Sequence, residues 1–275
     1  MKVLVTGSSG MLGSDVVRAA SFVNHEVVAL AHAELDVSDA DAVHSCFFTE
    51  RPHAVINCAA FTNVDEAEDD LPAAMAVNAD GARNVAVAAA LVEAKVVYVS
   101  TDYVFDGTKG EPYVESDEPN PLSVYGRTKL EGEREIRDGW VIRSSWLFGP
   151  TGKNFVRTML ELGREQHEVR VVDDQRGSPT YVRHLAEATK KVLQLPDRTY
   201  HVAAEGDCTW AELAETIFEE ARIACRVVPI SAEELGRPAP RPAYSVLRSE
   251  HLETPRLVHW REGLRECLER LDYRT

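Results

Sequence analysis

Short apolar runs alternate with longer segments of helical periodicity over the first 150 residues. The apolar runs predict buried strands, and they span 2–6, 25–31, 53–60, 95–101 and, with an exit loop, 139–150. The segments between them repeat apolar positions at helical spacing and predict helices over 7–20, 36–52, 71–94 and the stretch around residue 125. Such alternation is typical of an α/β protein whose parallel sheet is covered on both faces, most often a doubly wound (Rossmann) dinucleotide fold.

The alternation loosens after about residue 150. Helices are predicted over 153–165, 181–195, 209–223 and 256–271, with a strand and a turn over 168–180 and a strand over 198–206. We therefore predict a dinucleotide-binding Rossmann domain over 1–150. Residues 151–275 are expected to form mainly a smaller substrate-binding lobe over the carboxyl ends of the strands, with some elements returning to the main sheet.

The charge and cysteine content narrow the class of protein. The 275 residues carry a formal net charge of −15, so a basic face for nucleic acid is not expected. The five cysteines are scattered and odd in number, which favours neither a disulfide framework nor a zinc site. Because no signal peptide or membrane-spanning run is visible, we expect a cytoplasmic protein without a membrane partner.

A glycine-rich turn follows the first predicted strand. In TGSSGMLG, Gly7, Gly10 and Gly13 precede a predicted helix, the context of a pyrophosphate-binding loop. Gly7 would allow the tight turn, Gly10 the approach of the pyrophosphate to the backbone, and Gly13 close packing of the helix on the strand. The alternative is a strand–turn–helix in which the glycines serve packing alone.

The end of the second strand bears on the choice between NADH and NADPH. Ala31 and His32 stand where an acidic residue would hold a ribose diol or an Arg would hold a 2′-phosphate. The pattern leaves both cofactors open, and we favour NADPH or dual use. Asp36 and Val37 are predicted to contact the adenine, although Asp36 could equally cap the following helix.

A candidate catalytic group follows the fourth strand. Thr101 and Asp102 lie at its carboxyl end, where open α/β sheets bind ligands. Tyr125 and Lys129 are four residues apart and share a face of the next predicted helix. A neighbouring ammonium would bring the pKa of the phenol toward neutrality, and a Thr hydroxyl can align a substrate oxygen. This set suits proton transfer to a carbonyl during hydride delivery; the alternative is an ordinary exposed Tyr and Lys.

The chain resembles the dTDP-4-dehydrorhamnose reductase family of the extended short-chain dehydrogenase/reductases nearly from end to end. The resemblance rests on VTGSSGMLG, ELDVSDADAV, INCAAFTNVDEAE, AMAVNADGARNVA, YVSTDYVFDG, YGRTKLEGE, RSSWLFG, NFVRTML, DDQRGSPTY and RPAYSVL. STDYVFDG and RPxxSxL are specific to this subgroup. The resemblance implies NADPH- or NADH-dependent reduction of the C4 keto group of a dTDP-sugar, the small-molecule partner, by a monomer or homodimer.

The resemblance also implies roles for matching positions. Tyr125 would protonate the C4 oxygen, Lys129 would hold the nicotinamide ribose and lower the pKa of Tyr125, and Thr101 would bond the reacting oxygen. The other implied cofactor contacts are Gly10, Met11 and Leu12 for the pyrophosphate, with Ala60, Phe61 and Thr62 lining the cofactor. The other implied substrate contacts are Asp102, Trp146, Asn154 and Arg176, with Arg241 and Ser245 closing the lobe. Trp146 could instead be a core aromatic of the fifth strand, and Arg241 could simply be solvated.

The sequence departs from the family pattern at two positions. Met11 replaces a common Gln, which backbone contacts should tolerate, and His32 replaces a common Arg, which weakens an NADP assignment. The Glu residues that hold magnesium in some members find no match, so no metal site is predicted.

A related nucleotide-sugar epimerase, reductase or dehydratase is one alternative function. A non-catalytic regulatory subunit resembling that of methionine adenosyltransferase is the other.

Overall fold

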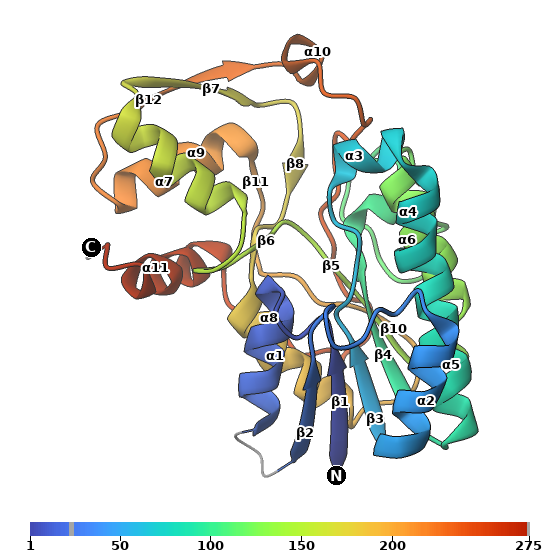
Figure 1. Cartoon of the computed structure of the whole chain (residues 1–275). Coiled ribbons are helices and arrows are strands. Elements are labelled where there is room, and N and C mark those ends of the chain that lie inside the picture. Colours follow the sequence, from blue (N-terminus) through green and yellow to red (C-terminus); the bar gives the residue numbers. More distant parts are fainter. Residues whose placement is uncertain (22–24, 274–275) are drawn as a thin grey trace.

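The computed structural model describes residues 1–21 and 25–273. Its main sheet, in the described part of the chain, has six parallel strands in the order β2-β1-β3-β4-β5-β10 (Figure 1). The strands are β1 (Lys2–Thr6), β2 (Glu26–Leu30), β3 (Ala54–Asn57), β4 (Lys95–Thr101), β5 (Gly139–Ser144) and β10 (Thr199–His201). The predicted α/β class and doubly wound parallel sheet are thereby confirmed.

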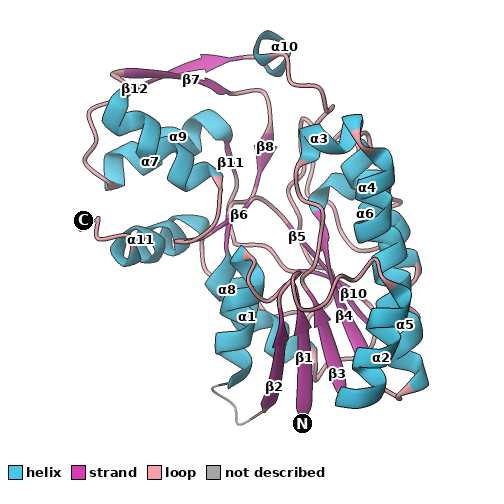
Figure 2. Ribbon diagram, in the orientation of Figure 1, coloured by secondary structure: helices cyan, strands magenta, loops and turns pink. Residues whose placement is uncertain are grey.

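Helices cover both faces of this sheet (Figure 2). Helices α1 (Met11–Ser21) and α8 (Val182–Val192) pack together on one face. On the other face lie α2 (Ala40–Glu50), α5 (Gly81–Leu91) and α6 (Val124–Arg134). Within β1, Val3 and Val5 join the core under α1 and α8, whereas Leu4 joins the core under α2 and α5. This alternation follows from the two-residue period of a strand.

The strand order places a switch point between β1 and β3. The chain leaves β1 toward β2 on one side and later returns to β3 on the other, so the loops after β1 and β3 diverge to opposite sides. A crevice between such loops is where open α/β sheets hold their ligands. The glycine loop leaves β1, and Cys58 to Thr62 leave β3, at this point.

The long Ala-rich helix expected over 71–94 is interrupted by a wider turn. It consists of α4 (Leu71–Met75), a π-helical turn (Ala76–Asp80) and α5. A π turn inserts one extra residue and is frequent at functional sites. Here it turns the buried Asn78 toward the exit of β3. A short helix, α3 (Val64–Asp69), follows that exit along the chain and is capped by Asn63.

The second half of the chain builds a lobe beyond the carboxyl edge of the sheet (Figure 1). Its parallel pair, β7 (Glu168–Val172) with β12 (Arg226–Ile230), packs against α9 (Trp210–Glu220), which contacts α7 (Phe155–Glu165). Shorter pairs are β6 (Leu147–Phe148) with β9 (Thr180–Tyr181) and β8 (Arg176–Gly177) with β11 (Cys208–Thr209). The lobe also contains α10 (Ala232–Leu235) and α11 (Trp260–Arg270).

Two details of the second half differ from the sequence prediction. The strand and turn expected over 168–180 form three short strands, β7, β8 and β9. The expected 198–206 strand is short, and its β10 portion pairs with β5 in the main sheet. No helix in residues 1–21 and 25–273 is long and apolar enough to cross a membrane.

Candidate active site

The glycine loop forms a tight cradle at the start of α1. Gly7 has a φ of +62°, a conformation that L side chains rarely adopt, and its carbonyl accepts a hydrogen bond from the Gly10 amide at 3.0 Å. A Cβ at Gly13 would lie 2.2 Å from the Gly7 carbonyl oxygen, so only glycine lets the helix approach. The free amides of the first turn of α1 therefore point toward the switch point, as an anion site requires.

The segment after β2 forms a compact turn beside this cradle. The Asp36 carboxylate accepts hydrogen bonds from the amide and hydroxyl of Ser38, which lower its pKa. The N-cap of α2 is Asp39, so Asp36 closes the turn and does not cap the helix. Val37 is buried against α5, where a Cβ at Gly81 would lie 2.7 Å from its Cγ2.

Asn78 fixes the β3 exit that carries Ala60, Phe61 and Thr62. Its Oδ1 accepts from the Phe61 amide at 2.9 Å, and its Nδ2 donates to the Phe61 carbonyl at 3.1 Å and to Thr128 Oγ1 at 3.0 Å. One buried amide thus ties the predicted cofactor wall to α6. Asn78 was not predicted as a site residue, although a polar residue in the apolar run AMAVNADG was a usable signal.

Helix α6 brings Tyr125 to the carboxyl end of β4. Ser123 caps the helix through the Gly126 amide at 3.1 Å, and the Val124 amide donates to Glu68 at 2.7 Å. A Cβ at Gly126 would lie 2.2 Å from the Tyr103 carbonyl oxygen, so this glycine allows the close approach. The Tyr125 hydroxyl is within hydrogen-bonding reach of Thr101, whose predicted bond to the reacting oxygen stays a prediction.

Tyr125 is a neutral phenol in this structure. Burial raises its pKa to about 12, the Asp102 charge adds to the shift, and the Thr101 hydroxyl opposes it. Burial dominates this pKa, and Lys129 is not among the groups that shift it; the role of Lys129 as the group that favours the phenolate stays a prediction. A protonated phenol is the form that can donate a proton.

Lys129 lies one turn further along α6, and its side chain is directed toward the backbone of β4. Its side chain is 2% exposed, its Nζ donates to the Val99 carbonyl at 2.7 Å, and it lies 4.0 Å from the centre of the Tyr98 ring. Burial lowers its pKa to about 7, and the Glu133 charge opposes that shift. The lysine therefore sits near the midpoint of its titration at neutral pH.

Asp102 is a buried carboxyl beside Thr101. Its Oδ1 accepts from Thr101 Oγ1 at 3.1 Å. The Ser245 hydroxyl is near the carboxylate, but Oδ2 makes no hydrogen bond that meets the distance and angle limits among the described residues. Burial raises its pKa to about 7, while the Ser245 and Thr101 hydroxyls oppose the shift. A buried acceptor without a partner is costly and fits a group that awaits a polar ligand.

Replacement of Asp102 by Asn should flatten the pH dependence of stability. The folded-state pKa is above the ordinary value of 3.8, so the folded protein binds more protons than the unfolded chain between about pH 4 and 7. Stability that is present below pH 4 is therefore lost as the pH rises through 7, by about 1 kcal/mol or more. Asp102→Asn should remove this loss in urea unfolding at pH 5 and pH 8.

Asp106→Asn is the matched control for that measurement. Hydrogen bonds from Thr108 and Asn120 lower the Asp106 pKa to about 2, so its titration lies below the tested pH range. This variant should keep the wild-type slope between pH 5 and 8. An unchanged slope in Asp102→Asn would show that Asp102 is ionised throughout.

Trp146 lies beyond the fifth strand and is not part of it. Strand β5 ends at Ser144, and Trp146 follows with a φ of +47°. Its half-buried ring stacks on Trp210 with centroids 3.5 Å apart, and a Cβ at Gly177 would collide with it. The stack joins the start of α9 to the exit of β5, a position consistent with a wall of the substrate site.

Asn154 and Arg176 are already engaged within the chain. Asn154 caps α7 through the Arg157 amide and donates to the Gly149 carbonyl at 2.9 Å. Arg176 forms ion pairs with Asp207 at 2.6 Å and Glu212 at 3.2 Å. Direct contact of either side chain with a nucleotide would require these bonds to rearrange, so the structure favours a positioning role for both.

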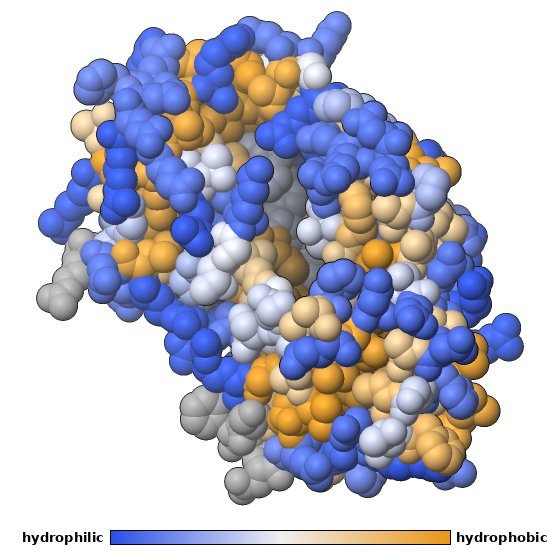
Figure 3. Space-filling view, in the orientation of Figure 1, coloured by the Kyte–Doolittle hydropathy of each residue, from blue (hydrophilic) through white to orange (hydrophobic). Residues whose placement is uncertain are grey.

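Ion pairs hold the segment before Ser245 across the site. Arg241 is paired with Asp65 of α3 at 2.9 Å, and its side chain is 11% exposed, so it is not simply solvated. Arg237, which also pairs with Asp65, is more than half exposed. Figure 3 shows the surface hollowed between the lobe and the helices on the other side of the sheet.

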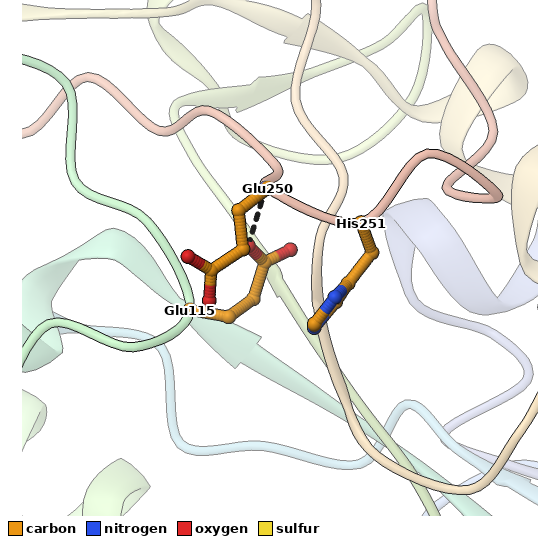
Figure 4. A group of neighbouring side chains, drawn as sticks. All are labelled: Glu115, Glu250 and His251. Atoms are coloured by element: carbon orange, nitrogen blue, oxygen red, sulfur yellow. Dashed lines mark hydrogen bonds between the residues drawn. The ribbon is translucent and has the colours of Figure 1, made fainter.

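An acidic group lies away from these residues. Glu115, Glu250 and His251 each offer one ligand atom within 4.8 Å of the others (Figure 4). The Glu115 carboxylate already accepts from the amides of His201 and Glu250 and from the Ser249 hydroxyl. These hydrogen bonds hold the loop around Glu250 against Glu115 and account for the proximity of the three side chains. We therefore assign no metal to them.

Comparison with known proteins shows what the chain resembles. The model of the RmlD substrate binding domain matches residues 1–273. The spore coat polysaccharide biosynthesis protein SpsK of Bacillus subtilis (strain 168) is 43% identical over 98% of this chain and 97% of its own. A dTDP-4-dehydrorhamnose reductase of Streptomyces griseus is 41% identical over 96% of this chain and 91% of its own.

A solved structure agrees with these relatives. The crystal structure of dTDP-4-dehydrorhamnose reductase from Bacillus anthracis in complex with NADP superimposes with a TM-score of 0.95 and 40% identity, over 98% of this chain and 99% of that one. The family resemblance predicted from the sequence is thereby confirmed. The chain belongs to the RmlD substrate binding domain family, among whose members are the dTDP-4-dehydrorhamnose reductases.

Proposed function

We propose that the protein reduces the C4 keto group of dTDP-4-dehydro-L-rhamnose to a hydroxyl, giving dTDP-L-rhamnose, with NADPH or NADH as reductant. The observation that carries the proposal is the placement of Thr101, Tyr125 and Lys129 at the carboxyl edge of a doubly wound sheet, beside a glycine cradle. Family membership supports the substrate class.

The cradle fits a dinucleotide. A Cβ at Gly7 would lie 2.7 Å from the Ala59 amide nitrogen, and one at Gly13 would fill the space between loop and helix. The pyrophosphate would lie against Gly10 on the amides of Met11 and Leu12, with Val37 toward the adenine and Phe61 and Thr62 along the cofactor. When bound, the reduced nicotinamide supplies hydride to the C4 carbon.

Tyr125 is proposed as the general acid. Its hydroxyl gives a proton to the C4 oxygen as that oxygen gains negative charge, so the C=O bond becomes an alcohol and a phenolate is left on Tyr125. The Thr101 hydroxyl, which donates to Asp102 in this structure, would turn to donate to the reacting oxygen and so align it beside Tyr125. Because the pKa of the phenol is about 12, Tyr125 carries its proton at neutral pH and can donate it.

Lys129 supplies the compensating positive charge. In its ammonium form it lowers the cost of the phenolate that forms on Tyr125, one helical turn away on α6. Its Nζ is held by the Val99 carbonyl and can reorient toward a cofactor ribose. Glu133, which forms a bidentate pair with Arg143, biases Lys129 toward that charged form.

The substrate's remaining contacts are proposed around the hollow. Asp102 offers an unpartnered oxygen to a sugar hydroxyl, and the Trp146 and Trp210 stack offers an aromatic wall. We infer that the protein acts on this small molecule in the cytoplasm, in keeping with five free cysteines. We expect the protein to be a monomer or a homodimer, and gel filtration would distinguish the two.

The test is loss of cofactor absorbance at 340 nm with purified protein and dTDP-4-dehydro-L-rhamnose. Oxidation of NADPH or NADH that depends on this sugar is expected. Parallel assays with the corresponding UDP- and GDP-4-keto sugars separate the proposal from another nucleotide-sugar enzyme. Cofactor binding without turnover of any keto sugar would contradict the proposal and favour a regulatory subunit, which should then co-purify with a synthetase in fixed ratio.

A further inference from the structure

The turn that follows β2 is in direct contact with the glycine loop. The Ser8 amide donates to the Leu30 carbonyl, the last residue of β2, at 3.1 Å. In a doubly wound fold the adenosine ribose of a bound dinucleotide is reached from this strand end, next to the phosphate loop. Side chains anchored at residue 31 therefore lie where the 2′ position of the ribose is recognised.

Glu34 folds back to this strand end. Its Oε2 accepts a hydrogen bond from the Ala31 amide at 2.7 Å, and the Glu34 amide donates to the Ala31 carbonyl at 2.9 Å. The turn thus returns an exposed carboxylate to the first residue after β2. Sequence analysis looked for an acidic residue at Ala31 and His32 and did not find one, because the turn supplies it from three positions further along.

The local charge is not suited to a phosphate. Neither Arg nor Lys occurs between Arg18 and Arg51 in the sequence, and Arg18 itself is paired with Asp15 at 2.6 Å. His32 is the one basic side-chain type in the turn, which also contains Asp36, whose carboxylate is held by Ser38. A second carboxylate therefore accompanies Glu34 on this segment.

We propose that Glu34 is a specificity-determining residue that makes this protein bind NADH more tightly than NADPH. The inference rests on the dinucleotide site of the proposed function. An ionised carboxylate accepts a hydrogen bond from the 2′-hydroxyl of NADH, whereas it repels the 2′-phosphate of NADPH. The anchoring bond from the Ala31 amide keeps the carboxylate in place for both effects.

The experiment measures the dissociation constants of NADH and NADPH by titration calorimetry for the wild type, Glu34→Gln and Glu26→Gln. Wild type should bind NADH about tenfold or more tightly than NADPH, because like charges at contact distance are costly. Glu34→Gln, whose amide oxygen can still accept from Ala31, should bring the two constants within about threefold. Glu26 lies at the opposite end of β2, so its variant should keep the wild-type ratio.

The ratio is compared within each protein, so a general weakening of the cofactor site cancels. Glu34→Lys provides a second variant and should reverse the preference. Equal or tighter NADPH binding by the wild type, or a ratio unchanged in both Glu34 variants, would overturn the inference while leaving the dinucleotide site intact. Failure of the wild type to bind either cofactor would instead overturn the proposed function, and the inference with it.

Discussion

Tyr125→Phe should lower kcat/KM for the keto sugar by about 10²–10⁴-fold and leave cofactor binding within about twofold of wild type. The substitution removes one hydroxyl, the proposed proton donor, and keeps the ring that packs edge-on to Tyr103 at 5.9 Å. Because the lost interaction is made in the transition state, kcat should fall more than KM rises. Steady-state assays and cofactor titration measure the two quantities separately.

The matched control for this variant is Tyr103→Phe. Burial raises the Tyr103 pKa beyond its ordinary value, and its hydroxyl interacts with Arg241 and not with Thr101. Its loss should reduce kcat/KM much less than the loss of the Tyr125 hydroxyl. If the two variants retain similar activity, Tyr125 is not the acid, and a water molecule or Asp102 must supply the proton.

Lys129→Met should lower activity without lowering stability. The rate should fall by about 10²-fold or more, because the phenolate formed on Tyr125 loses its compensating charge. The free energy of unfolding at pH 6 should rise, by about 1 kcal/mol or more, because a buried ammonium is replaced by an apolar chain. Glu133 keeps its partner Arg143, so the substitution leaves no unpaired buried charge.

The pH dependence of Lys129 gives the sign of both effects. Its folded-state pKa of about 7 is below the ordinary 10.5, so the unfolded chain binds more protons between these values and stability rises from pH 7 to 10.5. Activity has the opposite trend, since the ammonium form predominates below pH 7. Wild-type kcat/KM should therefore fall as the pH rises above 7, whereas Lys129→Met should be slow at every pH. A flat wild-type profile would contradict this role.

The periodic parts of the fold were predictable from the sequence. Buried parallel strands read as short apolar runs and helices as 3.6-residue patterns, so β1 to β5 and the helices between them were expected, except the short α3. The glycine loop and the Tyr125–Lys129 pair were equally visible, because their spacing is local. Family resemblance then added the substrate class, which no spacing in the chain encodes.

The parts that depend on distant contacts were not predictable in this way. The π turn carries Asn78, which bonds Phe61 and Thr128, residues 17 and 50 positions away. Lys129 bonds the carbonyl of Val99, and burial is the largest cause of the raised pKa of Tyr125. Glu34 becomes a candidate ribose ligand because its turn folds back on Ala31. Tertiary contacts of this kind determine the charge state and the direction of a side chain. They produce no periodic pattern in the sequence, so the sequence does not predict them.

The central claim is that this protein transfers hydride from a nicotinamide cofactor to C4 of dTDP-4-dehydro-L-rhamnose. Its most direct test uses cofactor that carries deuterium at both C4 positions of the reduced nicotinamide, followed by NMR of the sugar product. One deuterium atom bound to carbon 4 of dTDP-L-rhamnose is the predicted result. A product without deuterium at that carbon, or recovery of unreduced keto sugar while the cofactor stays reduced, would contradict the account.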